Sequence, residues 1–262
     1  LGVITKIVFR LIPHPTQDVT MLVPFKSTEK ACEAVSAVFR AGITPSALEF
    51  MEKDAIIFVQ KSKYTDVPFT IFKNINSYLL IEVDGNDQDQ LFLDAQIIND
   101  VLKHYNCGDV LFAESHSEQE RIWKVRRSIG LAVKQHSIYK EEDTVVPRAK
   151  LSHLLSGVKE IGLKHGFKSI CYGHAGDGNL HVNILREDLT DSQWKGVVKD
   201  GIREIFELCV ALGGTISGEH GIGFVQKEYM DIPFSQYSIE LQKNIKRVFD
   251  SKEILNPGKM FC

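Results

Sequence analysis

Apolar residues recur along the chain with two periods, and their alternation predicts the order of the secondary-structure elements. A period of two residues predicts strands, and a period of about 3.6 residues predicts amphipathic helices. The first part of the chain contains strand patterns at residues 19–25, 47–51, 78–83 and 110–113, with helical patterns after Ser27 and over residues 88–106. Residues 54–63 fit neither period, and residues 1–10 resemble a strand. The resulting order is β-α-β-β-α-β.

The same order recurs in the second part of the chain. Its patterns are a strand at residues 144–146, a helix at 151–165, two strands around a turn at 176–179, a helix at 191–212 that Asp191 is expected to cap, and a strand at 215–216. A helix over residues 116–135 joins the two parts. Another over residues 238–250 follows them, and its apolar residues, including Val248 and Phe249, are expected to be buried. We therefore predict an α+β fold of two ferredoxin-like β-α-β-β-α-β units, with a mainly antiparallel sheet and flanking helices on one face.

The glycine-rich turn at residues 176–179 separates two histidines. After this turn, apolar residues alternate with His181 and Asn183, which places these two polar side chains on one face of the strand. If the strands pair as a hairpin, His174 returns opposite His181, and opposed residues have Cβ atoms roughly 4.5–5.5 Å apart. This spacing suits two imidazoles that share a metal ion. Two surface histidines on a hairpin would give the same pattern.

A second glycine-rich stretch, residues 213–223, carries Glu219 and His220 among five glycines. Glycine weakens a strand, so its repeated use indicates that the backbone approaches another group closely. His174, His181 and Glu219 form a common set of ligands for a divalent metal, zinc or manganese, that leaves positions open for substrate. The alternative is a solvated loop in which the acid and the histidine have no metal to bind.

The linking helix over residues 116–135 carries two adjacent arginines in different environments. At about 100° per residue, Arg126 falls at the rim of the apolar stripe, and Arg127 falls on the opposite face. An arginine at a buried edge usually meets an anion or a carboxylate, because an unpaired charge there is costly. Its stem can also pack while its head reaches water. The pattern alone leaves both roles of Arg126 open.

Composition narrows the class of protein. The formal net charge is −3 and the basic residues form no cluster, which argues against a nucleic-acid-binding protein. Five scattered cysteines indicate neither a disulfide framework nor a thiolate zinc site, and they favour a reducing compartment. No apolar run approaches the roughly 20 residues of a transmembrane helix. We therefore expect a cytoplasmic protein, with peripheral attachment to a membrane left open.

Three motifs carry a family resemblance. Residues 173–181 read GHAGDGNLH, residues 217–223 read SGEHGIG, and residues 254–260 read ILNPGKM. In this order they resemble the C-terminal domain of FAD-linked oxidases of the vanillyl-alcohol oxidase type, in the branch of the D-lactate, glycolate and D-2-hydroxyglutarate dehydrogenases. The resemblance implies that residues 1–17 are the end of a flavin-binding domain. Residues 18–262 would then be a substrate-binding cap domain, duplicated internally over about 18–115 and 140–225.

This resemblance implies oxidation of a 2-hydroxy acid with hydride transfer to FAD, which is bound mainly by a preceding domain. Together with the patterns above, it assigns His220 as the general base, Arg126 and Asn183 as substrate-binding residues, and Asn256 as a residue close to the flavin. The metal ligands remain His174, His181 and Glu219. The electron acceptor is unknown, and a homodimer or additional electron-transfer subunits are left open.

The chain departs from the D-2-hydroxyglutarate branch, which has a Lys-Tyr-Asp run where this chain has Glu141, Glu142 and Asp143. Acids at this place would repel a second substrate carboxylate, which favours D-lactate, glycolate or a similar monocarboxylate. Three alternatives stay open: a D-2-hydroxyglutarate-type dehydrogenase, a metal-dependent hydrolase and a non-catalytic ligand-binding module.

Overall fold

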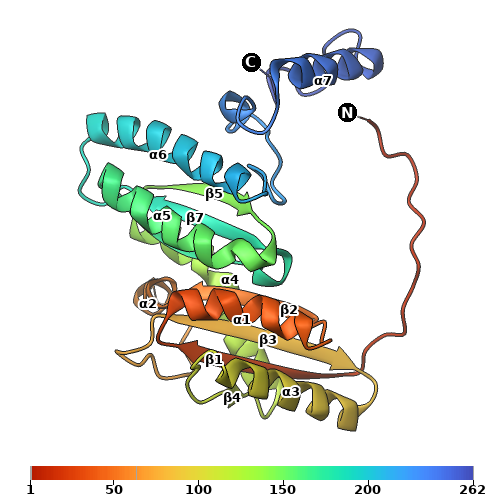
Figure 1. Cartoon of the computed structure of the whole chain (residues 1–262), viewed down its shortest axis with the longest axis vertical. Coiled ribbons are helices and arrows are strands. Elements are labelled where there is room, and N and C mark those ends of the chain that lie inside the picture. The colour runs from red at the N-terminus through yellow and green to blue at the C-terminus, as the bar shows by residue number, and fades with distance from the viewer. Residues whose placement is uncertain (1, 63, 262) are drawn as a thin grey trace.

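A single antiparallel sheet organises the computed structural model, which describes residues 2–62 and 64–261. Within those residues the sheet has seven strands in the spatial order β4-β1-β3-β2-β6-β7-β5 (Figure 1). The strands are β1 (Gln17–Phe25), β2 (Ala47–Glu52), β3 (Ser77–Gly85), β4 (Leu111–Phe112), β5 (Tyr139–Val145), β6 (Lys168–Gly173) and β7 (Asn179–Leu185). The two parts of the chain join where β2 pairs with β6, with Phe50 opposite Gly173. The mixed helix-and-strand architecture is confirmed.

Helices cover both faces of this sheet. In the described part of the chain they are α1 (Thr28–Arg40), α2 (Lys53–Ser62), α3 (Gln88–Lys103), α4 (His116–His136), α5 (Leu151–His165), α6 (Asp191–Ala211) and α7 (Gln236–Phe249). Helices α1, α3, α5 and α6 pack on one face, whereas α2 and α4 pack on the other. The expectation that all helices lie on one face was wrong. The segment that fitted neither period forms α2, which pairs with α4 over the opposite face.

Alternation along the strands divides the interior into two cores. Met21 and Phe50 belong to the core under α1, α3, α5 and α6, whereas their neighbours Leu22 and Met51 belong to the core under α2 and α4. Successive residues of a strand point to opposite faces, so each central strand supplies both cores. Fully burying an aliphatic side chain of this size stabilises a fold by about 1.5–3 kcal/mol. We call the face under α2 and α4 the α4 face.

Local signals set several of the helix ends. Ser27 caps α1 by accepting a hydrogen bond from the backbone of Lys30 at 3.1 Å. For α6 the expected cap was Asp191, but the cap is Thr190, which exchanges hydrogen bonds with Gln193 in a capping box. A threonine followed three residues later by glutamine is the stronger signal, because it satisfies two backbone donors at once.

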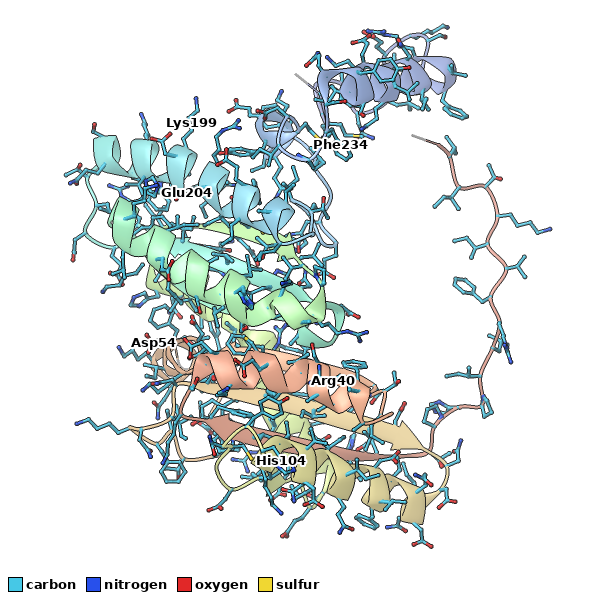
Figure 2. The ribbon with its side chains drawn as sticks, in the orientation of Figure 1. Arg40, Asp54, His104, Lys199, Glu204 and Phe234 are labelled. Atoms are coloured by element: carbon cyan, nitrogen blue, oxygen red, sulfur yellow. The ribbon has the colours of Figure 1, made fainter. Side chains whose placement is uncertain are left out.

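Both ends of the chain extend beyond the sheet (Figure 1). Residues 2–16 form no strand, although the backbone of Thr16 donates to the carbonyl of Gly85 at 3.1 Å. The segment runs apart from the sheet towards α7 in Figure 2. Helix α7 projects from the opposite end, and of its apolar residues only Ile239 is buried. Val248 and Phe249 were expected to be buried but are exposed. No described helix is both long and apolar enough to cross a membrane.

Candidate active site

The β6–β7 hairpin positions the two histidines. Strand β6 ends at Gly173, and a short turn over Ala175–Asp177 leads into β7. The hairpin is confirmed, but Tyr172 rather than His174 lies opposite His181 in the strand register. His174 follows the end of β6, and its ring centroid is 5.7 Å from that of His181. Gly178 closes the turn at φ 77°, where an added Cβ would meet the carbonyl oxygen of Val146 at 2.0 Å.

Asp143 on β5 holds the second glycine-rich stretch against this hairpin. Its Oδ2 accepts hydrogen bonds from the backbone amides of Glu219 and His220, at 2.7 and 2.8 Å. Burial tends to raise the pKa of Asp143, but these amide hydrogen bonds outweigh burial and lower it. Gly218 allows the close approach, because an added Cβ would lie 2.1 Å from the Asn179 amide nitrogen. The loop therefore presents Glu219 and His220 from a fixed backbone.

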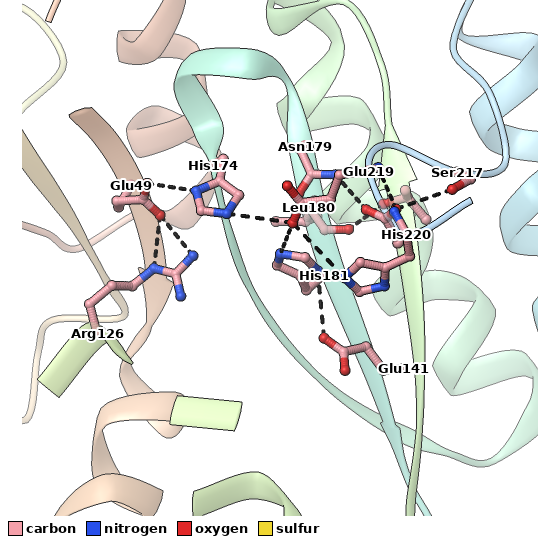
Figure 3. Close-up of polar contacts among 12 residues, drawn as sticks. Glu49, Arg126, Glu141, His174, Asn179, Leu180, His181, Ser217, Glu219 and His220 are labelled. Atoms are coloured by element: carbon pink, nitrogen blue, oxygen red, sulfur yellow. Dashed lines mark hydrogen bonds and ion pairs between the residues drawn. The ribbon is translucent and has the colours of Figure 1, made fainter. Parts of the chain in front are cut away.

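Three side chains converge at this point (Figure 3). Ligand atoms of His174, His181 and Glu219 all lie within 4.8 Å of one another. Oε1 of Glu219 is 3.7 Å from Nε2 of His174 and 3.6 Å from Nε2 of His181. These separations are too long for hydrogen bonds. They are close to the spacing of about 3.3–3.6 Å between two ligands of a tetrahedral metal with bonds of about 2.0–2.2 Å.

Glu49 on β2 backs the first histidine. The Nδ1 of His174 lies 2.7 Å from Oε1 of Glu49, so the ring donates to a buried carboxylate and its Nε2 faces Glu219. This hydrogen bond raises the pKa of His174. Burial tends to raise the pKa of Glu49, but the bond from His174 and the charge of Arg126 lower it below its usual value.

His181 lies deeper than His174. Its Nε2 faces Glu219, and its Nδ1 is 3.5 Å from Oε1 of Glu141 on β5. Burial, together with the nearby charge of Arg126, lowers the pKa of His181 to about 4. A neutral imidazole is the form that binds a metal, so this environment favours the ligand form.

Arg126 projects from α4 towards the same site. Its Nε and Nη2 lie 2.8 and 2.7 Å from Oε2 of Glu49, and its guanidinium sits over the ring of Tyr172 at 5.1 Å. Arg127 lies on the exposed side of the helix, where it pairs with Glu120. The predicted difference between the two arginines is therefore confirmed. The other N–H groups of the Arg126 guanidinium do not contact Glu49.

Asn183 and His220 differ in burial and in their neighbours. Asn183 is fully buried on the α4 face, near the hydroxyl of Tyr172, and its Oδ1 accepts no hydrogen bond among the described residues. His220 is half-exposed, and its ring stacks on that of His181 with centroids 5.4 Å apart. Solvent thus reaches the site from the side of His220 and Glu219.

The acidic run of residues 141–143 does not act as one surface. Strand β5 begins at Tyr139, earlier than expected, so the three acids alternate between faces. Glu141 and Asp143 point to the α4 face, opposite Asn183 and His181 respectively. Glu142 points to the other face and hydrogen-bonds Gln226. Only Glu141 remains available to meet a substrate, because the carboxylate of Asp143 is occupied by the loop.

Asn256 lies in the C-terminal tail, in a left-handed conformation at φ 49°. The tail returns towards the site loop, since the backbone N–H of Met260 donates to the carbonyl of Gly223 at 2.7 Å.

The sequence did not identify Glu49 or the anchoring role of Asp143. Both are acids within strands, and their neighbours in the sequence do not distinguish them from acids that face solvent.

Comparison with known proteins assigns the chain to a family. The family described as FAD linked oxidases, C-terminal domain, matches residues 14–260. The chain is 31% identical to a D-lactate dehydrogenase of Anaerostipes hadrus and 31% identical to the glycolate oxidase subunit GlcD of Bacillus subtilis (strain 168). The matches cover 99% and 100% of this chain and 55% of each relative. A D-2-hydroxyglutarate dehydrogenase of Stutzerimonas stutzeri (strain A1501) is 28% identical over 100% of this chain and 56% of its own length.

The fold has counterparts among solved structures. That of p-cresol methylhydroxylase with bound substrate superposes with a TM-score of 0.69 at 14% identity, over 96% of this chain and 54% of the other. The chain spans about half the length of the curated relatives it matches. The family match extends over nearly all of the sequence, and the chain belongs to the FAD linked oxidases as their C-terminal domain.

Proposed function

We propose that this chain is the substrate-binding part of an FAD-dependent dehydrogenase of 2-hydroxy acids. The substrate would be D-lactate, glycolate or a similar monocarboxylate, oxidised to the 2-oxo acid. The observation that carries the proposal is the convergence of His174, His181 and Glu219 beside His220. Family membership favours redox chemistry at this site over hydrolysis.

The donor set supports a divalent metal, zinc or manganese. Each imidazole turns Nε2 towards Glu219, and a carboxylate stands behind its Nδ1, Glu49 in one case and Glu141 in the other. Metal-bound histidines usually donate their other ring N–H to a carboxylate, a backbone carbonyl or water, and the hydrogen bond from His174 to Glu49 is of this kind. Four carboxylates, counting Asp143, surround the site, and the nearby guanidinium offsets only one of their charges. A dication would relieve this excess of negative charge.

When bound, the metal would supply stabilisation of an alkoxide, and FAD would supply the hydride acceptor. The protein residues have the remaining tasks. His220 would accept the proton of the substrate hydroxyl, because it is exposed and its ring stacks on a metal-facing histidine. Arg126 would bind the substrate carboxylate through the N–H groups that Glu49 leaves free. Asn183 would hydrogen-bond the substrate through its unpartnered amide oxygen.

The proposed preference for a monocarboxylate over a dicarboxylate substrate depends on Glu141, because the other two acids of the run are not available to substrate. Its side chain is partly exposed on the α4 face, near the hydroxyl of Tyr172, and burial raises its pKa. A second substrate carboxylate close to Glu141 would be opposed by like charge or by the cost of protonating the acid. The second candidate is a D-2-hydroxyglutarate dehydrogenase, which the similarity to the Stutzerimonas stutzeri relative supports.

We also infer the domain arrangement. Strand order β4-β1-β3-β2, and the isolated bridge that adds Thr215 beside β5, support two ferredoxin-like units over about 18–115 and 140–225. FAD would be bound mainly by the part of the relatives that this chain does not span, with residues 1–17 at its border and Asn256 close to the flavin. The name of the GlcD relative supports additional subunits, and a homodimer is the alternative assembly. A cytoplasmic or membrane-peripheral location remains part of this proposal.

Turnover by the FAD-loaded, full-length enzyme tests the function. We expect kcat/KM for D-lactate or glycolate to exceed that for D-2-hydroxyglutarate, and Glu141→Lys to shift the ratio towards the dicarboxylate. Elemental analysis of the same protein should give about one divalent ion per chain. A preference of the unmodified enzyme for the dicarboxylate would favour the second candidate, and no oxidation of any 2-hydroxy acid would overturn the proposal.

A further inference from the structure

A buried carboxylate from the first part of the chain contacts both the candidate metal site and the candidate substrate site. Glu49 is 6% exposed and lies on β2, whereas His174 follows β6 in the second part of the chain. The two strands are hydrogen-bonded neighbours, so Glu49 reaches across the junction between the two parts. One oxygen of Glu49 contacts His174, and the other contacts Arg126 (Figure 3).

The contact with His174 selects one form of the imidazole. A carboxylate can only accept a hydrogen bond, so Nδ1 must carry the hydrogen at the distance of 2.7 Å. The lone pair of a neutral ring is then on Nε2, the atom that faces Oε1 of Glu219. The opposite tautomer would place two acceptors against each other at Nδ1 and leave no free lone pair at the metal side.

The contact with Arg126 makes the acid difficult to replace. Both neighbours of Glu49 are donors: Nδ1–H of His174 to Oε1, and Nε–H of Arg126 to Oε2 at 2.8 Å. A glutamine has one acceptor oxygen and one NH2 group, so it can satisfy only one of these two donors. The negative charge of Glu49 also balances the positive charge of the Arg126 guanidinium, which would otherwise be buried without a counter-charge.

We propose that Glu49 is a positioning residue that fixes His174 with Nε2 towards the metal and holds Arg126 beside it. This inference rests on the proposed function of the same site. The junction between β2 and β6 then also has a role at the site, because the carboxylate of Glu49 orients both the metal ligand His174 and the substrate-binding Arg126. Replacement of a group behind a metal ligand typically weakens metal affinity 10–100-fold.

The test compares Glu49→Gln with Glu52→Gln in the FAD-loaded, full-length enzyme. Glu52 is a matched control on the same strand: it is buried and paired with Lys159 of α5, but it points to the opposite face. We expect Glu49→Gln to weaken zinc binding by about 10–100-fold and to raise KM for the substrate. Glu52→Gln should lower the midpoint of urea unfolding but keep the zinc affinity of the unmodified enzyme.

Nitrogen-15 NMR of the His174 ring supplies a readout that is independent of activity. The unmodified protein should show a hydrogen on Nδ1, and Glu49→Gln should show a mixture of tautomers. Glu49→Asp keeps the charge and both acceptors, so it should retain the Nδ1–H form and part of the zinc affinity, and it carries the test if the glutamine variant does not fold. Unchanged tautomer and zinc affinity in Glu49→Gln would overturn the inference. If the unmodified enzyme binds no zinc or manganese, the proposed function fails, and the tautomer still decides the role of Glu49.

Discussion

Replacing Asp143 by asparagine should release the loop that carries Glu219 and His220. The carboxylate now serves two sides: Oδ2 accepts from the two loop amides, and Oδ1 accepts from the side chain of Asn179 at 2.6 Å. Asparagine has nearly the same size, but it has one acceptor oxygen and one NH2 group. In either orientation, Asp143→Asn turns an NH2 group towards a donor.

The magnitude follows from the bonds that are lost. A hydrogen bond to a charged group contributes roughly 1.5–3 kcal/mol. If the NH2 group faces the loop, two such bonds are lost, although solvent can partly satisfy the half-exposed residues Glu219 and His220. We therefore expect Asp143→Asn to lower the free energy of unfolding by about 2–4 kcal/mol. Each of the two loop amides loses one such bond of roughly 1.5–3 kcal/mol, and 1.36 kcal/mol corresponds to a factor of ten, so its hydrogen should exchange about 10–150-fold faster.

Hydrogen exchange resolved by residue, urea unfolding and zinc titration measure these effects. The matched control is Glu142→Gln, because Glu142 is the next residue of β5, is buried, and binds Gln226 and Lys140 on the opposite face. This control should lower stability without changing exchange at Glu219 and His220 or the zinc affinity. If Asp143→Asn left the exchange of both amides within a factor of two, Asp143 would not be the anchor of the loop.

Three further predictions concern the site itself. His174→Ala should abolish the stoichiometry of about one metal per chain; unchanged metal content in elemental analysis would contradict the site. Glu219→Gln should lose metal, whereas His220→Ala in the full-length enzyme should keep it and lose about 10²–10⁴-fold in kcat; equal metal loss in both would show that the base is misassigned. Arg126→Ala should lower kcat/KM for every 2-hydroxy acid, and Arg127→Ala should change it little; a larger loss at Arg127 would refute the assignment.

The sequence predicted those parts of the site that local patterns encode. Alternation after the turn placed His181 and Asn183 on one face, and the structure places both on the α4 face. Glycine content predicted that the loop around Glu219 approaches another segment, and Gly218 lies against Asn179 with no room for a Cβ. Such features depend on a few consecutive residues, so they can be recognised without knowing the fold.

Contacts between distant segments could not be predicted in this way. Glu49 and His174 are 125 residues apart, and they meet only because β2 pairs with β6. The same limit explains the error in α7: periodicity shows which side of a helix is apolar, but not whether another element covers it. Val248 and Phe249 are on the apolar side and are nevertheless exposed.

The arrangement of acids explains how a covered sheet face can also hold a reactive site. Polar residues on such a face are costly unless each has a hydrogen-bond partner. Here Glu49 accepts a hydrogen bond from His174, and Asp143 accepts hydrogen bonds from the loop amides, whereas Glu141 lies 3.5 Å from Nδ1 of His181 without a hydrogen bond. These carboxylates come from β2 and β5, which flank the hairpin in the sheet order. The pairing of the strands therefore brings Glu49 against His174, and Asp143 on β5 holds the backbone of Glu219, so this part of the site geometry is built by the fold before any metal or substrate binds.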